Sequence, residues 1–260
     1  MKTITTAFIA EVMKLRRSRI FWITIIFFAF IPLMMGLMMF VALHPETAEK
    51  MGMFGSKASL VSKNNWSGYY GLLVQSGASI SLIGFGFISS WVFGREYNDR
   101  TIKDILALPV SRSSIVISKF IVILLWCMLL SLVQFLVAML IGQIIGIPEW
   151  SSVDFYDFID RYFICSFLTA LICSPVAFMA CYSRGVIAPV GFVIVTLILS
   201  QLLGVVGLAP YFPWATPGLY AVSNGTTAFR LTGISYLIFS ITWLAGLIGT
   251  ISWWRFADQN

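Results

Sequence analysis

Six long stretches without a charged residue constrain this chain more than any other feature of its sequence. Asp, Glu, Lys and Arg are absent from residues 20–45, 64–94, 120–148, 162–183, 185–229 and 231–254. A helix needs about 20 apolar residues to cross the ~30 Å hydrocarbon core of a bilayer, and each stretch is long enough. Because 59% of the 260 residues are hydrophobic, a soluble core of this length could not bury them all. We therefore expect an all-α polytopic membrane protein.

Prolines decide how many spans these stretches hold. Residues 185–229 could form two spans, but Pro210, Pro213 and Pro217 crowd the second half. A proline inside a helix costs ~3 kcal/mol or more, and the freed backbone groups cannot face lipid. We expect one span there, followed by a broken re-entrant segment at the outer interface over residues 208–229. The six spans expected within a single transmembrane domain, residues 1–260, are about 20–43, 69–94, 119–147, 162–183, 186–207 and 231–254.

The distribution of Lys and Arg predicts the orientation of these spans. Cytoplasmic loops of membrane proteins carry an excess of both residues. With the N-terminus inside, twelve of the seventeen fall on the inner side and five on the outer side, so both termini are expected to be cytoplasmic. The same bias accounts for the net charge of +6, because the basic residues flank spans. We expect the lipid bilayer as a partner and no nucleic acid.

The N-terminal segment, residues 3–17, has the pattern of an amphipathic helix. Its apolar residues at helical spacing are Ile4, Phe8, Val12 and Leu15, and its charged residues lie off that stripe. We expect an interfacial helix on the inner leaflet.

The uncharged spans lack the groups that most membrane chemistry needs. Without an intramembrane carboxylate, histidine or base, a proton-driven transporter is disfavoured and no catalytic residue is expected. His44 is the only histidine and the four cysteines form no CxxC pair, so neither a metal site nor a disulfide framework is predicted. The chain is therefore not expected to be an enzyme.

The polar residues at membrane depth are glutamines and small residues. Gln75, Gln134, Gln143 and Gln201 are each expected first of all to form hydrogen bonds between helices. Gln75 and Gln201 are also candidates for a substrate pathway. The small residues Gly77, Ser81 and Gly84 predict a close helix contact, either within the chain or with a second subunit.

Residues 94–119 are unlike the rest, with eight charged residues among 26. Thr101 and Asp104 have the spacing of a capping box at the start of a short helix, and Pro109 stops this helix. Ser111 or Ser113 can cap the next helix. The apolar stripe of this short helix would be Ile102, Ile105 and Leu106. We expect an amphipathic helix in a cytoplasmic loop over 95–118.

This helix could lie on lipid or dock into a protein. Acidic side chains at Glu96, Asp99 and Asp104 are unfavourable beside an anionic leaflet, where a lipid-binding segment would be almost purely basic. Mixed charge suits a complementary protein groove, so the loop is predicted to be a docking element.

The segment FGREYNDRTIKDILALPVSRSSIVISK, within the six-span layout, resembles the permease subunits of the type-two ABC exporter family. In that family a GRE(Y/F)...GT...L...P(V/I)SR pattern joins spans two and three, and the resemblance covers essentially the whole chain. It implies that the loop helix is a cytoplasmic coupling helix that contacts a separate ATPase. Arg100 stands where relatives often have Gly. The residues carried over for ATPase coupling are Glu96, Arg100, Thr101, Ile102, Asp104, Ile105, Leu106, Pro109 and Arg112. Of these, Glu96, Arg100, Thr101, Ile102 and Ile105 would face the ATPase.

The resemblance also implies the assembly and its function. The permease would dimerise with itself or with a closely related permease and bind two copies of an ABC ATPase, which would hold ATP and magnesium. This chain has no Walker motif and is expected to hold no cofactor. The implied function is export of an amphipathic or apolar substrate across the cell membrane of a prokaryote, as in bacitracin-resistance and lantibiotic-immunity permeases. The alternatives are a non-transporting scaffold or sensor, or a permease for sodium extrusion or copper-enzyme maturation.

Overall fold

The computed structural model describes residues 2–44, 65–102, 110–150, 155–222 and 231–256, and these ranges contain helices and no strands. Within them, six helical segments are long and apolar enough to cross a membrane. They are α2 (Arg19–Leu43), α4 (Trp66–Asn98), α6 (Arg112–Ile145), the pair α7 (Phe155–Leu171) and α8 (Ser174–Tyr182), α9 (Ile187–Val206) and α11 (Gly233–Phe256). The sequence-based expectation of a six-span, all-α membrane protein is confirmed.

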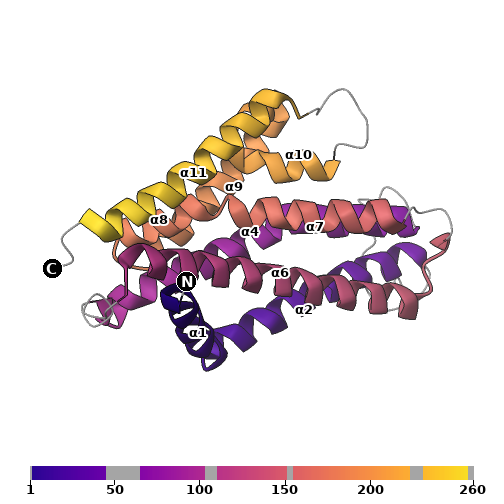
Figure 1. Ribbon diagram of the computed structural model, residues 1–260. Coiled ribbons are helices and arrows are strands. Elements are labelled where there is room, and N and C mark those ends of the chain that lie inside the picture. Colours follow the sequence, from indigo (N-terminus) through magenta and orange to yellow (C-terminus); the bar gives the residue numbers. More distant parts are fainter. Residues whose placement is uncertain (1, 45–64, 103–109, 151–154, 223–230, 257–260) are drawn as a thin grey trace.

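The spans form a bundle with two distinct ends (Figure 1). The start of α1 and the end of α11 lie at the same end as the last turns of α4 and α8, and we call this the terminal end. The last turns of α2, α6 and α10 point to the opposite end. This alternation is the one that six spans require when both termini are on one side. A further helix, α1 (Lys2–Arg16), precedes α2 at the terminal end.

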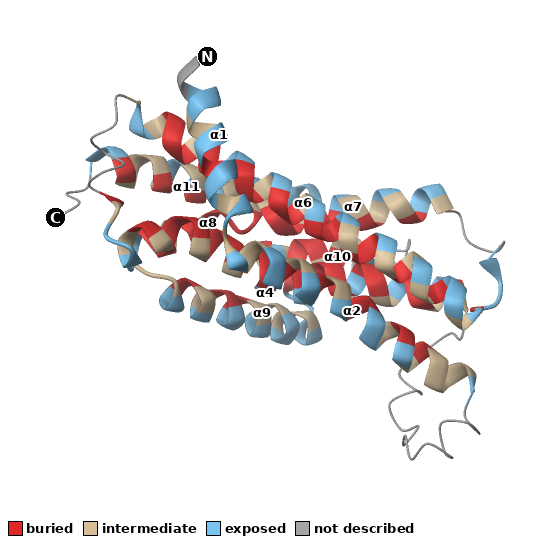
Figure 2. Cartoon of the chain, turned by 90° about the horizontal axis from the view of Figure 1, so that it is seen from below, coloured by how far each residue is buried: buried red, intermediate tan, exposed pale blue. Residues whose placement is uncertain are grey.

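The centre of the bundle is built around α4. Buried residues run along α4 and α6, whereas α9 lies at the margin with most of its surface exposed (Figure 2). A β-carbon added to Gly84 would lie 2.6 Å from the ring of Phe28 on α2, so the missing side chain allows α2 and α4 to approach. Ser81 hydrogen-bonds Gln134 of α6 at 3.4 Å. These small residues therefore serve close contacts within the chain.

Proline accounts for the break in the fourth span. The sequence predicted one helix over 162–183, but the helix begins earlier, at Phe155, and is divided between Leu171 and Ser174. Pro175 occupies the first turn of α8, where its missing N–H costs nothing.

Prolines also shape the segment that follows α9. It contains the 3₁₀ turns η3 (Ala209–Tyr211) and η4 (Pro213–Ala215) and the helix α10 (Thr216–Val222), which packs on α4 and α7. The expectation that this segment is not one continuous helix agrees with the structure as far as Val222. Its re-entry into a membrane interface stays a prediction, and residues 223–229 lie outside the described residues.

Candidate functional site

Five charged side chains from three helices meet at the terminal end of the bundle. Lys119 of α6 is at the centre: its Nζ lies 3.1 Å from Oε2 of Glu11 and 2.9 Å from Oε1 of Glu96. The Lys14 ammonium lies 3.2 Å from a carboxylate oxygen of each glutamate. Arg95 donates from Nη2 to Glu11 at 3.2 Å. We call this set, Glu11, Lys14, Arg95, Glu96 and Lys119, the charge cluster.

The charge cluster is largely buried. Lys119 is 0% exposed, Glu96 3% and Glu11 4%. Charged side chains are rarely buried to this extent unless they are paired, because removal from water costs several kcal/mol per ion. Three cations share two carboxylates here, so each carboxylate has several counterions. The cluster joins α1, α4 and α6 at the point where the chain leaves α4 for the loop before α6, which is the predicted coupling loop.

This arrangement corrects the expected solvent-facing placement of several charges. The coupling loop was expected over 95–118, but α4 continues to Asn98 and α6 begins at Arg112, so four of its charged residues and neighbours, Arg95, Glu96, Arg112 and Lys119, lie on the ends of spans. Glu11 was expected on the polar face of an amphipathic helix, and it is instead the residue through which α1 contacts α4 and α6. The Ser118 hydroxyl adds a hydrogen bond to the Ile4 carbonyl at 3.2 Å.

Electrostatics keep the Glu11 carboxyl ionised. Burial raises the pKa of Glu11, but the nearby ammonium groups of Lys119 and Lys14 lower it more strongly, and the pKa ends below the ordinary value of 4.5. The ion pairs are therefore present at neutral pH.

The turn after α4 positions the start of the coupling loop. The Arg100 N–H donates to the Tyr97 carbonyl at 3.2 Å and the Thr101 N–H to the Glu96 carbonyl at 3.0 Å, which is the hydrogen-bond pattern of a Schellman motif. Arg100 has a φ of 58°, in the left-handed region that glycine adopts without strain. A glycine at this position would adopt the same conformation without strain. The Thr101 hydroxyl donates to Glu96 at 2.8 Å and so links the loop to the charge cluster.

Arg100 and Thr101 lie in this turn after α4, and the other seven predicted coupling residues fall into three groups. Glu96 and Ile102 were expected to face a partner, but both are buried against the chain itself, with Ile102 6% exposed. Arg112 donates to the carbonyls of Trp254 and Arg255 at 3.2 Å, which ties the start of α6 to the end of α11. Asp104, Ile105, Leu106 and Pro109 lie outside the described residues. The coupling role of all nine residues stays a prediction.

Ser111 confirms the expected start of the next helix. It is the N-cap of α6, where its Oγ accepts from the Ser114 N–H at 3.2 Å. Arg112 is thereby fixed as the first residue of the helix.

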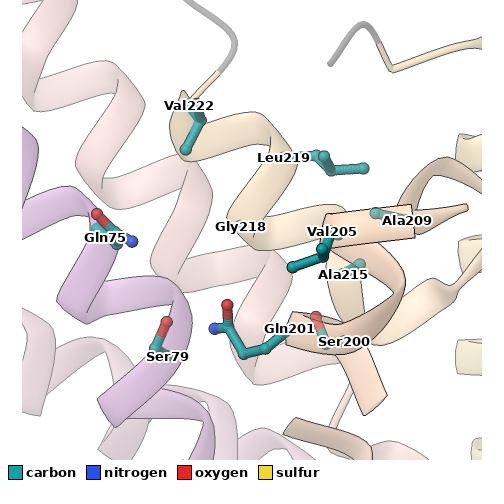
Figure 3. Close-up of a pocket in the computed structure, with 11 residues that line it drawn as sticks. Gln75, Ser79, Ser200, Gln201, Val205, Ala209, Ala215, Gly218, Leu219 and Val222 are labelled. Atoms are coloured by element: carbon teal, nitrogen blue, oxygen red, sulfur yellow. The ribbon is translucent and has the colours of Figure 1, made fainter. Parts of the chain in front are cut away.

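A pocket of about 360 Å³ lies between α4, α9 and α10 and brings together Gln75 and Gln201, the two glutamines predicted for a substrate pathway. Gln75 and Ser79 come from α4, whereas Ser200 and Gln201 come from α9 (Figure 3). The other lining residues are small or apolar and come from α9, the 3₁₀ turns and α10: Gly204, Val205, Ala209, Ala215, Gly218, Leu219 and Val222.

The pocket can form hydrogen bonds but carries no charge among its lining residues. Each glutamine carboxamide both donates and accepts, and each serine hydroxyl does the same. Gln134, by contrast, is fully buried outside this pocket, donates to Ser76 at 2.8 Å and accepts from Ser81. Gln134 is therefore an interhelical hydrogen bonder, as expected. Sequence alone could not separate it from Gln75, because the three-dimensional packing decides which amides meet one another.

Comparison with known proteins shows the family to which this chain belongs. A family model described as ABC-2 family transporter protein matches residues 7–200. The chain belongs to the ABC-2 family of transporter proteins. The matched range includes the charge cluster, the coupling loop and the α4 and α9 helices, up to Ser200 at the edge of the pocket.

One relative carries a more specific description. The bacitracin transport permease protein BCRB of Bacillus licheniformis is 27% identical over 175 residues, which are 67% of this chain and 83% of that protein. As an ABC-2 family member with six apolar helices, the chain is a multi-pass membrane protein and a permease subunit of an ABC transporter. Membership in this family implies a partner ATPase.

Proposed function

We propose that this chain is the membrane subunit of an ABC exporter that moves an amphipathic or apolar molecule out of the cell or its membrane, and that a separate subunit hydrolyses the ATP. The observation that carries the proposal is the pocket between α4 and α9. It combines four uncharged polar side chains from α4 and α9 with small and apolar residues, without a charged group among its lining residues.

This chemistry favours some substrates over others. A bare ion that leaves water needs charged or closely packed oxygen ligands, and the lining residues do not include a carboxylate. A molecule with an apolar body and neutral amide or hydroxyl groups matches both sides of the pocket. A peptide antibiotic has this chemistry, and the similarity to a bacitracin transport permease supports that class.

We place energy input at the terminal end. The coupling loop begins at the Schellman turn, and Thr101 joins it to Glu96 in the charge cluster. An ATPase docked on the loop would therefore be connected to α1, α4 and α6 together. In this proposal two ATPases bind a dimer of this permease or of this chain with a close relative, in the plasma membrane of a prokaryote with both termini cytoplasmic.

Leucine substitutions at the two glutamines test the pocket. Gln75→Leu and Gln201→Leu keep side-chain size but remove the carboxamides, and each should lower ATP-dependent export of an amphipathic peptide several-fold in reconstituted vesicles. Gln143→Leu is the matched control, because Gln143 is exposed on α6 and does not line the pocket. Equal export by all three variants would remove the pocket from the pathway.

Docking is tested separately at the loop. Ile105→Asp should weaken co-purification of the ATPase, because a charge in an apolar contact is strongly unfavourable, whereas Lys103→Ala should have little effect. Normal co-purification and ATP turnover with Ile105→Asp would contradict the docking role.

Orientation is tested by thiol labelling. In a cysteine-free background, a single cysteine at Ser59 or Ser152 should react with an impermeant thiol reagent in intact cells, and one at Asn98 should not. The reverse pattern would overturn the proposed orientation.

A further inference from the structure

A second pocket, also of about 360 Å³, lies in the seam between α6 and α11, away from the glutamine-lined pocket. Its walls are almost entirely apolar, and α6 and α11 supply most of them. The lining residues are Ser89, Ile117, Phe120, Ile121, Ile123, Leu124, Ala170, Leu171, Ser174, Trp243 and Leu247. We call this space the seam pocket.

The position of the seam pocket along the bundle is well defined. On α6 it extends from Ile117, two residues before the charge cluster at Lys119, to Leu124, and seven residues of helix cover about 10 Å. On α11, Leu247 lies eight residues before Arg255, or about 12 Å along the helix. The pocket therefore lies in the half of the bundle nearest the terminal end, at a depth that a bilayer would fill with hydrocarbon.

Two serine hydroxyls lie in the seam pocket. Ser174 donates to the Trp243 carbonyl at 2.7 Å. Ser89 of α4 also lines the pocket, and this residue is 1% exposed. A serine hydroxyl both donates and accepts, so an acceptor on a bound molecule can pair with it.

Cationic groups lie where the seam reaches the terminal end. Arg112, at the start of α6, holds the last carbonyls of α11. Arg255, in the last turn of α11, is exposed. Arginine pairs well with phosphate oxygens, and an anionic headgroup beside these two residues would have a complementary charge.

From these observations we infer that the seam pocket binds the acyl chain of an anionic phospholipid from the leaflet at the terminal end, with its phosphate near Arg112 and Arg255. The apolar walls take the chain, and Ser89 donates to an ester carbonyl. This site is separate from the glutamine-lined pocket and does not depend on the transported substrate.

Photo-crosslinking tests the inference. The purified protein is reconstituted in nanodiscs that contain phosphatidylglycerol with a diazirine in the acyl chain, and labelled peptides are mapped by mass spectrometry. Labelling should concentrate on residues 117–124 and 243–247 and fall several-fold when Leu124→Trp fills the pocket. Ile121→Trp, at the partly exposed edge, is the second variant in case the first does not fold.

The controls distinguish lipid from other occupants. Leu125→Trp adds the same ring to the exposed face of α6 outside the pocket and should leave labelling unchanged. In the parent protein, unlabelled phosphatidylglycerol should reduce the labelling more than unlabelled phosphatidylcholine does. Arg255→Gln should make this difference between the two lipids smaller. Labelling spread evenly over all spans and unaffected by both tryptophan variants would overturn the inference. Crosslinks from these peptides to a second copy of the chain would also overturn it.

Discussion

Removing the Lys119 side-chain charge should destabilise the protein more than removing any exposed charge. Lys119 is fully buried and contacts both carboxylates of the charge cluster, at 3.1 and 2.9 Å. Deleting one partner of a buried ion pair costs up to ~3–5 kcal/mol, because the buried charges that remain lose a close counterion, here the fully buried one shared by both carboxylates. In a protein of this size that cost corresponds to a melting temperature lower by on the order of 10 °C.

Lys119→Met is the informative substitution, since methionine nearly preserves the length of the side chain without its charge. The assay is thermal unfolding of the purified protein in detergent. Lys14→Met is the control: the Lys14 side chain is 40% exposed, so water screens its pairs and the loss should be about 1 kcal/mol or less.

A compensating variant tests the cause. When Glu96→Gln is added to Lys119→Met, the carboxylate closest to Lys119 is neutralised with it, while Glu11 keeps Arg95 and Lys14 as counterions, so much of the lost stability should return. A parent-like melting temperature for Lys119→Met, or no recovery in the double variant, would refute the reasoning.

Four further predictions follow from individual contacts. Arg100→Gly should leave the free energy of unfolding unchanged or raise it by up to ~1 kcal/mol, because the φ of 58° is strained for arginine. Arg100→Val should lower the free energy of unfolding. Gln134→Leu removes hydrogen bonds to Ser76 and Ser81 and should cost about 1–2 kcal/mol in thermal unfolding, unlike the exposed Gln143→Leu. Gly84→Ala should destabilise the protein because its β-carbon meets the Phe28 ring, Phe28→Leu should partly restore it, and Gly71→Ala, with nothing within 4 Å, should be tolerated. The pKa of Glu11 is lowered on folding, so its contribution to stability is complete above its ordinary value of 4.5 and is lost as the pH falls through the lower folded value. Melting scans at falling pH should show a smaller loss for Glu11→Gln than for the parent protein.

The number and nature of the spans could be predicted because hydrophobic length is a local property. Each uncharged stretch had to satisfy its backbone hydrogen bonds as a helix, whatever its neighbours were. The break near Cys173 shows the limit: Pro175 lies inside a long apolar stretch, and only the packed bundle shows that α7 ends at Leu171.

The charge cluster was missed because its members are far apart in the sequence. Glu11 lies off the apolar stripe of α1, which sequence reasoning assigns to water, and Lys119 lies close enough to the start of α6 to be counted with the loop. Glu11 and Glu96, as acidic residues among the basic residues of the predicted inner face, were the signal that could have been followed. Acidic residues in such a place need specific counterions.

Part of the glutamine-lined pocket could be predicted from the sequence. Amide side chains at membrane depth are uncommon enough to make Gln75 and Gln201 candidates for a substrate pathway, and the structure brings both to one pocket. Ser79 and Ser200, one turn or less from these glutamines, were not singled out, because serine at a helix interface has many ordinary roles.

The central claim is that this permease couples a separate ATPase to the export of an amphipathic or apolar substrate. The most direct test measures ATP turnover by the reconstituted complex of this chain and its ATPase, with and without an amphipathic peptide antibiotic such as bacitracin. The account predicts that the peptide stimulates turnover without a requirement for sodium, that the ATPase alone does not respond, and that Gln201→Leu weakens the stimulation. Turnover that ignores the peptide, or that strictly requires sodium, would contradict it.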